Sequence, residues 1–133
     1  MSAPNKISVS DVPGVTPSKN GSTMVIAGGL VFVSGVVAKS DAGEWVEGDI
    51  KVHTRIAIGN AQKRLQHIGL DLGDVVSATI YLSKYDEDFN NMNEAYFECF
   101  ENFKPLPARA CVGISKMGNN TDIEISFVAA TRK

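Results

Sequence analysis

Hydrophobic residues along the chain repeat with two different periods, which predict strands and helices. A two-residue period, or a short apolar run rich in β-branched residues, predicts five strands, at residues 24–26, 30–37, 75–82, 108–114 and 122–130. Gly28 and Gly29 separate the first two strands, a pattern typical of a tight hairpin. The last two strands are joined by Gly118, Asn119 and Asn120, which favour a turn.

Two other segments repeat their apolar residues every three or four positions, as an amphipathic helix does. The first helix is predicted over residues 49–68, with Asp49 as its N-cap and Gly69 as its stop. The second follows Asp86 or Asp88 as its cap, and its core-facing stripe is Phe89, Met92, Tyr96, Phe97 and Phe100. Polar residues of the first helix lie off its apolar stripe and are interpreted as a solvated face: Lys51, Arg55, Lys63, Arg64 and Gln66.

The resulting order of elements, β-β-α-β-α-β-β, predicts an α+β fold with a mixed sheet and both helices packed on one face. Each helix lies between strands and is long enough to return the chain across the sheet. Residues 1–133 are expected to form one domain. Three prolines within residues 1–23 indicate an extended N-terminal arm on the surface, with at most a short strand at residues 7–9.

Alternation within the last two strands assigns side chains to the two faces of the sheet. Ile123, Ile125, Phe127 and Ala129 share one face, which we expect to pack against the helices. Glu124 then lies on the helix-free face, and the alternation of the preceding strand predicts Arg109 and Cys111 there as well. Two helices are too few to cover both faces, so the uncovered face predicts self-association, with polar residues lining clefts between subunits.

The composition of the chain narrows the classes of function that it can have. The chain has 133 residues, a mass of 14.3 kDa and 44% hydrophobic residues, enough to bury a core without disulfides. It carries 13 basic and 15 acidic residues, a net charge of -2 and a pI near 5.6. Nucleic-acid binding depends on clustered Lys and Arg, so we expect no nucleic-acid partner.

The chain lacks the patterns of metal, disulfide and membrane proteins. Cys99 and Cys111 are too few for a disulfide framework or a zinc site, and they favour a reducing compartment. His53 and His67 lie fourteen residues apart on one helix, too far to share a metal, so no metal site is expected. No stretch reaches the roughly 18–20 apolar residues of a membrane span, and residues 1–15 have neither a signal-peptide pattern nor Arg-rich amphipathic character. The expected location is cytoplasmic, with import into an organelle such as the mitochondrion left open.

Taken singly, the candidate residues have ordinary structural roles as well. An arginine or glutamate on a strand, such as Arg109 or Glu124, more often forms a surface ion pair than a site. Cys111 is more often a small buried hydrophobe than a nucleophile, because no histidine lies in an activating context.

Five motifs in a fixed order carry more information than any one residue. They are Ser34-Gly35, Ile68-Gly69-Leu70 with Asp74-Val75-Val76, Asp88-Phe89 with Asn93-Glu94-Ala95-Tyr96, Pro107-Ala108-Arg109-Ala110-Cys111-Val112, and Ile123-Glu124-Ile125. From about Met24 to the C-terminus, the chain thereby resembles the Rid family of reactive intermediate deaminases, also known as the YjgF family.

The resemblance implies a chorismate-mutase-like fold that assembles as a homotrimer, with three clefts between subunits and no metal or organic cofactor. RidA-type members hydrolyse enamines and imines, such as 2-iminopropanoate and 2-iminobutanoate, to 2-keto acids and ammonia. Arg109 would then hold the substrate carboxylate through two parallel donors, and Glu124 would orient or deprotonate the attacking water. Cys111 would contribute backbone groups, Asn93 would support the cleft and Ser34 would line it.

One departure from the family pattern concerns the arm. RidA-type members place a Tyr after a Gly-Pro, whereas this chain has Thr16-Pro17-Ser18, and the familiar Ser-Gly-Gln becomes Ser34-Gly35-Val36.

Two alternative functions stay open. One is a trimeric small-carboxylate-binding or regulatory protein without turnover. The other is the ribonuclease or translation-inhibitor role of some relatives, which the net charge of -2 disfavours.

Overall fold

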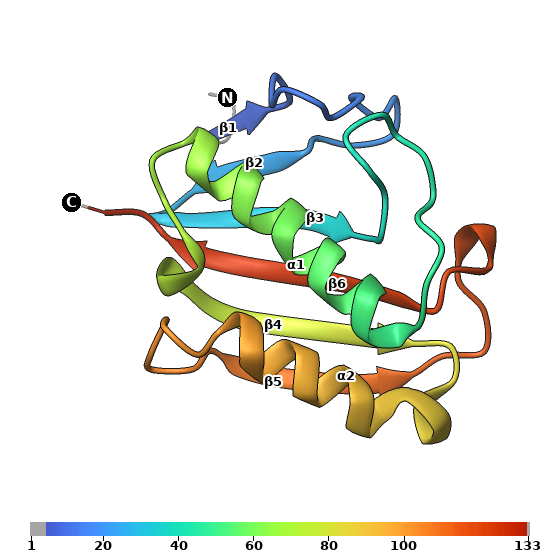
Figure 1. Cartoon of the computed structure of the whole chain (residues 1–133). Helices are drawn as coiled ribbons and strands as arrows, with labels where there is room; N and C mark the ends of the chain where they lie inside the picture. The colour runs from blue at the N-terminus through green and yellow to red at the C-terminus, as the bar shows by residue number, and fades with distance from the viewer. Residues whose placement is uncertain (1–4, 133) are drawn as a thin grey trace.

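The computed structural model describes residues 5–132, which form one six-stranded sheet with two long helices on one of its faces (Figure 1). The strands are β1 (Lys6–Val9), β2 (Met24–Ala27), β3 (Leu30–Val36), β4 (Val75–Leu82), β5 (Ala108–Gly113) and β6 (Ile123–Ala130). Their order in the sheet is β1-β2-β3-β6-β4-β5, with a parallel pair between β4 and β5 and antiparallel pairs elsewhere. The predicted mixed sheet is confirmed, and β1 adds an edge strand to it.

The helices are α1 (Ile50–His67) and α2 (Tyr85–Cys99). Asp49 caps α1 as expected, because its carboxylate accepts a hydrogen bond from the Val52 amide at 3.0 Å. The predicted cap of α2 is wrong: the helix begins at Tyr85, and Lys84 at the cap position makes no side-chain bond. Asp86 and Asp88 lie instead within the first turn, where carboxylates favour the positive end of the helix dipole.

The hydrophobic core fills the space between the two helices and the sheet. The inward face of β6 is the expected one, since Ile123, Ile125, Phe127 and Ala129 are all buried. From α2, Met92, Tyr96 and Phe100 are buried against it as predicted. Phe97, which the sequence assigned to the same core-facing stripe, is 44% exposed, so the prediction was wrong for this residue. In the described residues, neither helix is long and apolar enough to cross a membrane.

Strand β5 presents the reverse of the expected faces. It pairs with β4 in the register Ala78↔Arg109 and Ile80↔Cys111, and opposite residues of paired strands share a face. Ala78 and Ile80 are buried beneath the helices, so Arg109 and Cys111 lie on the helix-covered side. The prediction that placed them with Glu124 was wrong because β5 is an edge strand of small residues, whose alternation carries little burial signal.

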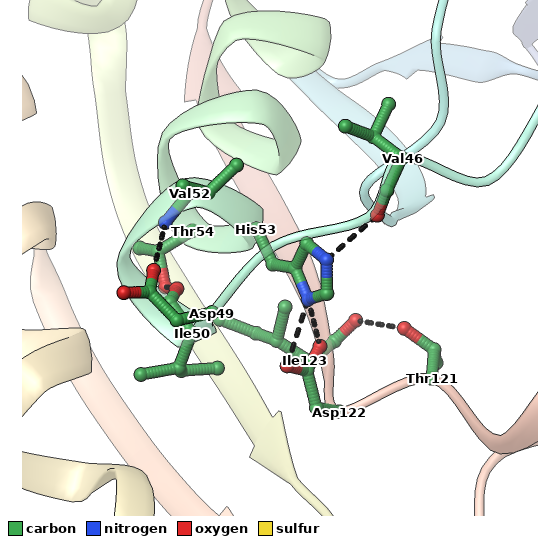
Figure 2. A network of polar contacts seen from close by, with 9 residues as sticks. All are labelled: Val46, Asp49, Ile50, Val52, His53, Thr54, Thr121, Asp122 and Ile123. Carbon is green, nitrogen blue, oxygen red and sulfur yellow. Dashed lines mark hydrogen bonds and ion pairs between the residues drawn. The ribbon is translucent and has the colours of Figure 1, made fainter.

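A histidine fastens the start of α1 to the sheet and to the preceding loop (Figure 2). His53 Nδ1 lies 2.7 Å from Asp122 Oδ2, and Nε2 lies 2.7 Å from the Val46 carbonyl oxygen. Both partners are acceptors, so each ring nitrogen that carries a proton can donate to one of them. The side chains of His53 and Asp122 are only 17% and 22% exposed. The contact therefore joins three segments in a largely desolvated setting.

Replacing this histidine is expected to destabilise the fold. His53→Ala should lower the free energy of unfolding by about 1–3 kcal/mol, because it leaves two acceptors without their donors. His67→Ala is the matched control, since His67 pairs with the 82% exposed Asp11 and such a surface pair contributes about 0–1 kcal/mol. Urea unfolding followed by circular dichroism measures both variants. Equal loss in the two would contradict the assignment.

Candidate functional site

The five candidate residues fall into two groups on opposite sides of the sheet. We call Asn93 on α2 with Arg109 and Cys111 on β5 the edge group, and Ser34 on β3 with Glu124 on β6 the open-face group. Strand β4 separates β5 from β6, so these two strands lie about 10 Å apart at the usual strand spacing, and along β4 Arg109 is opposite Ala78 whereas Glu124 is opposite Tyr81. A single chain therefore assembles each group but keeps the edge group and the open-face group on opposite sides of the sheet.

The Arg109 side chain rests on aromatic rings of α2. Its guanidinium carbon lies 4.9 Å from the centroid of the Tyr96 ring and 5.4 Å from that of Phe97. These cation–π contacts fix the guanidinium beside the two rings, and a guanidinium can donate two parallel hydrogen bonds to a carboxylate. Phe97 is an exposed aromatic side chain, and its contact with this cation gives it a role outside the core.

Three buried polar atoms of this region have no hydrogen-bond partner among the described residues: Nη1 of Arg109, Oδ1 of Asn93 and Oη of Tyr96. Buried polar groups are nearly always paired, so a cluster of orphaned ones indicates a place where a polar ligand or a partner chain binds. Burial raises the pKa of Tyr96 to about 12 despite the opposing charge of Arg109, so its hydroxyl stays protonated. Sequence reasoning treated Tyr96 as a core aromatic and missed this polar end.

Glu124 of the open-face group lies directly over Gly35. A Cβ atom on residue 35 would come within 2.6 Å of Glu124 Oε2, so any other side chain there would force the Glu124 carboxylate out of this position. An irregularity in the β3–β6 pairing between Val33 and Val36 brings the two together. Ser34 donates a hydrogen bond of 2.6 Å to the Ser22 carbonyl oxygen and thereby ties β3 to the arm. In the sequence, Gly35 was indicated as a candidate by its place in the Ser34-Gly35 motif.

A cavity of about 490 Å³ opens beside the open-face group, between the arm, the end of β3 and α1. We call it the arm cavity. Ser34 and Gly35 line it together with Ser18, which stands where the family resemblance implies a tyrosine. The small side chain of Ser18 leaves this side of the open-face group polar and roomy.

Cys111 does not have the character of a nucleophile. Burial raises the pKa of its thiol, and the nearby positive charge of Arg109 opposes that shift less strongly. The thiol is therefore protonated at neutral pH, and the side chain is partly buried against the core. Within residues 5–132, no cluster of three or more His, Cys, Asp and Glu side chains is placed to hold a metal ion.

Comparison with known proteins identifies the family. The profile of the family described as "Endoribonuclease L-PSP", to which the YjgF and Rid proteins belong, matches residues 15–131. The chain belongs to the Rid family. A RutC family protein of Pyrococcus abyssi is 38% identical over 109 residues, which are 81% of this chain and 84% of that protein. A Schizosaccharomyces pombe relative named "Protein mmf2, mitochondrial" is 38% identical over 80% of this chain and 83% of its own length.

Rid relatives with a named activity or ligand are more distant. The 2-iminobutanoate/2-iminopropanoate deaminase of Escherichia coli is 27% identical over 79% of this chain and 82% of its own length. The crystal structure of E. coli TdcF with bound serine superposes with a TM-score of 0.80 at 25% identity, covering 91% of this chain and 94% of that one. The fold predicted from the sequence is thus the Rid fold, and some members of the family are deaminases.

The raised pKa of Cys111 has a measurable consequence. In a Cys99→Ser variant, the rate of alkylation by iodoacetamide should rise with pH along a curve whose midpoint lies above the ordinary thiol value of 9.0, because only the thiolate reacts. The complementary Cys111→Ser variant reports on Cys99, whose pKa burial also raises. A midpoint near neutral pH for Cys111 would contradict the assignment and would make a thiolate nucleophile reasonable.

Proposed function

We propose that the protein is a deaminase of reactive imines, which hydrolyses 2-imino acids such as 2-iminopropanoate and 2-iminobutanoate, together with their enamine forms, to 2-keto acids and ammonia. The observation that carries the proposal is the stacked guanidinium of Arg109, with a buried Nη1 that lacks a partner among the described residues. Such a group fits the carboxylate that every 2-imino acid carries. The deaminases among the Rid relatives support the same reaction.

The edge group supplies substrate binding. Arg109 holds the carboxylate in a fixed orientation, and Asn93 and Tyr96 offer further polar atoms beside it. Cys111 contributes backbone groups, because β5 pairs only with β4 in the described residues and its outer edge has N–H and C=O groups free. Orientation alone accounts for much of the rate that an already electrophilic imine needs.

Glu124 activates the attacking water in this proposal. As general base it takes a proton from a water whose oxygen adds to the imine carbon, which gives a carbinolamine. Glu124 delivers this proton to the imine nitrogen, which completes the carbinolamine. The hydroxyl proton then passes to the same nitrogen, the carbon–nitrogen bond breaks, and ammonia leaves as the carbonyl forms. Water is the only co-reactant, so this reaction calls for neither a metal nor an organic cofactor. Gly35 keeps space for the carboxylate that performs this step.

A homotrimer unites the two groups in this proposal. The open face of the sheet exposes apolar side chains, among them Phe32 and Val112 at 45% and 41%. Burying this face against a second chain would cover them and bring the edge group of one chain to the open-face group of the next. Three equivalent clefts result. We place the reaction in the cytoplasm, with the mitochondrion as the alternative that the S. pombe relative supports.

A second candidate is a carboxylate-binding protein without turnover. It is favoured by Ser18 at the position of the implied tyrosine, and by the relative whose solved structure holds serine. Calorimetry with 2-oxobutanoate separates the candidates, since binding without any acceleration of imine loss would favour this one. A ribonuclease role, which the family description names, is disfavoured by a net charge of -2.

The deaminase proposal predicts a strict need for arginine at residue 109. Arg109→Lys keeps the charge but loses the two parallel donors, so kcat/KM for 2-iminobutanoate should fall roughly 10- to 150-fold, the equivalent of about 1.5–3 kcal/mol for charge-assisted bonds. The assay follows semicarbazone formation while an amino-acid oxidase generates the imine. Arg55→Lys is the matched control, because Arg55 forms an exposed ion pair with Glu98 and should be neutral.

Two results would overturn the proposal. Wild-type protein that fails to accelerate loss of the imine would exclude the reaction. Full activity in Arg109→Lys would exclude bidentate anchoring of the carboxylate by this residue.

A further inference from the structure

Arg64 on α1 is a partly buried cation that forms no ion pair with the described residues. It belongs to the polar residues that the sequence assigned to a solvated helix face, but its side chain is partly buried and its Nε is fully so, with no hydrogen-bond partner among the described residues. Burial alone lowers the pKa of its guanidinium, and neither a charge nor a hydrogen bond offsets that loss. A buried charge without a partner is costly, which points to a missing anion.

The guanidinium lies in the wall of the arm cavity, where other cations are already engaged. Lys63 forms an ion pair of 3.0 Å with Asp41, and Lys39 places its ammonium 4.7 Å from the centroid of the Trp45 ring. Asp41 is the one acidic residue among those lining the cavity in the described chain, and Lys63 neutralises it. Arg64 is therefore the cation that remains free for a ligand.

The cavity is continuous with the open-face group. Ser34 and Gly35 line it, and Gly35 lies directly against the Glu124 carboxylate. Hydroxyl groups on the arm side, including those of Thr16 and Ser18, add polar partners to a space of about 490 Å³. An anionic group held by Arg64 would thus belong to a molecule in the arm cavity that can extend toward Gly35, against which the Glu124 carboxylate lies.

We propose that Arg64 binds a second carboxylate of the substrate, so that the arm cavity selects dicarboxylic 2-imino acids, those derived from acidic amino acids, over monocarboxylic ones. This inference rests on the proposed function, since it assigns the first carboxylate to Arg109 and the hydrolysis to Glu124. A guanidinium fits a carboxylate through two parallel donors, and a desolvated one gains more from that contact than an exposed one. A single free guanidinium matches a single added carboxylate.

The test compares two imines in three proteins. Wild type should hydrolyse 2-iminoglutarate with a higher kcat/KM than 2-iminobutanoate. Arg64→Met should lower kcat/KM for 2-iminoglutarate about tenfold or more and change that for 2-iminobutanoate less than about twofold. Arg64→Lys should retain part of the preference, because it keeps the charge. Arg55→Met on the same helix is the control, since its partner Glu98 lies outside the cavity.

Binding gives a readout that does not depend on turnover. In calorimetry, 2-oxoglutarate should bind to wild type more tightly than 2-oxobutanoate, and Arg64→Met should abolish the difference. The variant should also unfold at a urea concentration no lower than wild type, because it removes a buried charge that has no partner among the described residues.

The outcomes separate this inference from the proposed function. Equal loss for both imines in Arg64→Met, or no loss for either, would overturn the assignment of Arg64 while leaving the deaminase intact. Absence of turnover with every imine, together with Arg64-dependent binding of 2-oxoglutarate, would overturn the deaminase and uphold the dicarboxylate site. Absence of Arg64-dependent binding and of any preference would overturn the site whatever the enzyme does.

Discussion

The alternation of side chains along a strand is the constraint on which the site depends. Residues on paired strands share a face only in a fixed register, and that register puts Arg109 on the helix-covered side and Glu124 on the open side of one sheet. No rotamer of either side chain changes this. A reaction that needs both groups at one substrate therefore needs a second chain, and the apolar open face provides the surface for it.

The same sheet explains why each group is well positioned. Tyr96 belongs to the buried core and also stacks on Arg109, so packing that stabilises the fold also orients the guanidinium. On the open face, Gly35 leaves room for the Glu124 carboxylate, which a side chain at residue 35 would displace. Beside it, the arm encloses a cavity whose free cation is Arg64. The binding groups thus belong to helices and strands, and the arm closes the remaining side of the cavity.

Sequence reasoning succeeded where burial repeats with a clear period. The fully apolar inward face of β6 and the Asp49 cap of α1 follow from local pattern alone. It failed for β5, because an edge strand of small residues has no strongly apolar face that marks the inward side. In addition, sequence alone assigns an arginine to the solvent side, although Arg109 contacts aromatic rings of α2. The burial of Arg64 could not be predicted either, since the arm residues that line the same cavity are distant from it in sequence.

Complementation between two inactive variants tests most directly whether the site is shared between chains. Arg109→Ala and Glu124→Gln should each be inactive alone. Co-expressed in equal amounts, they should recover about one quarter of wild-type turnover of 2-iminobutanoate, because in a cyclic trimer a cleft is complete when one neighbour keeps Arg109 and the other keeps Glu124. Activity of the mixture that stays at the level of the separate variants would contradict the shared site.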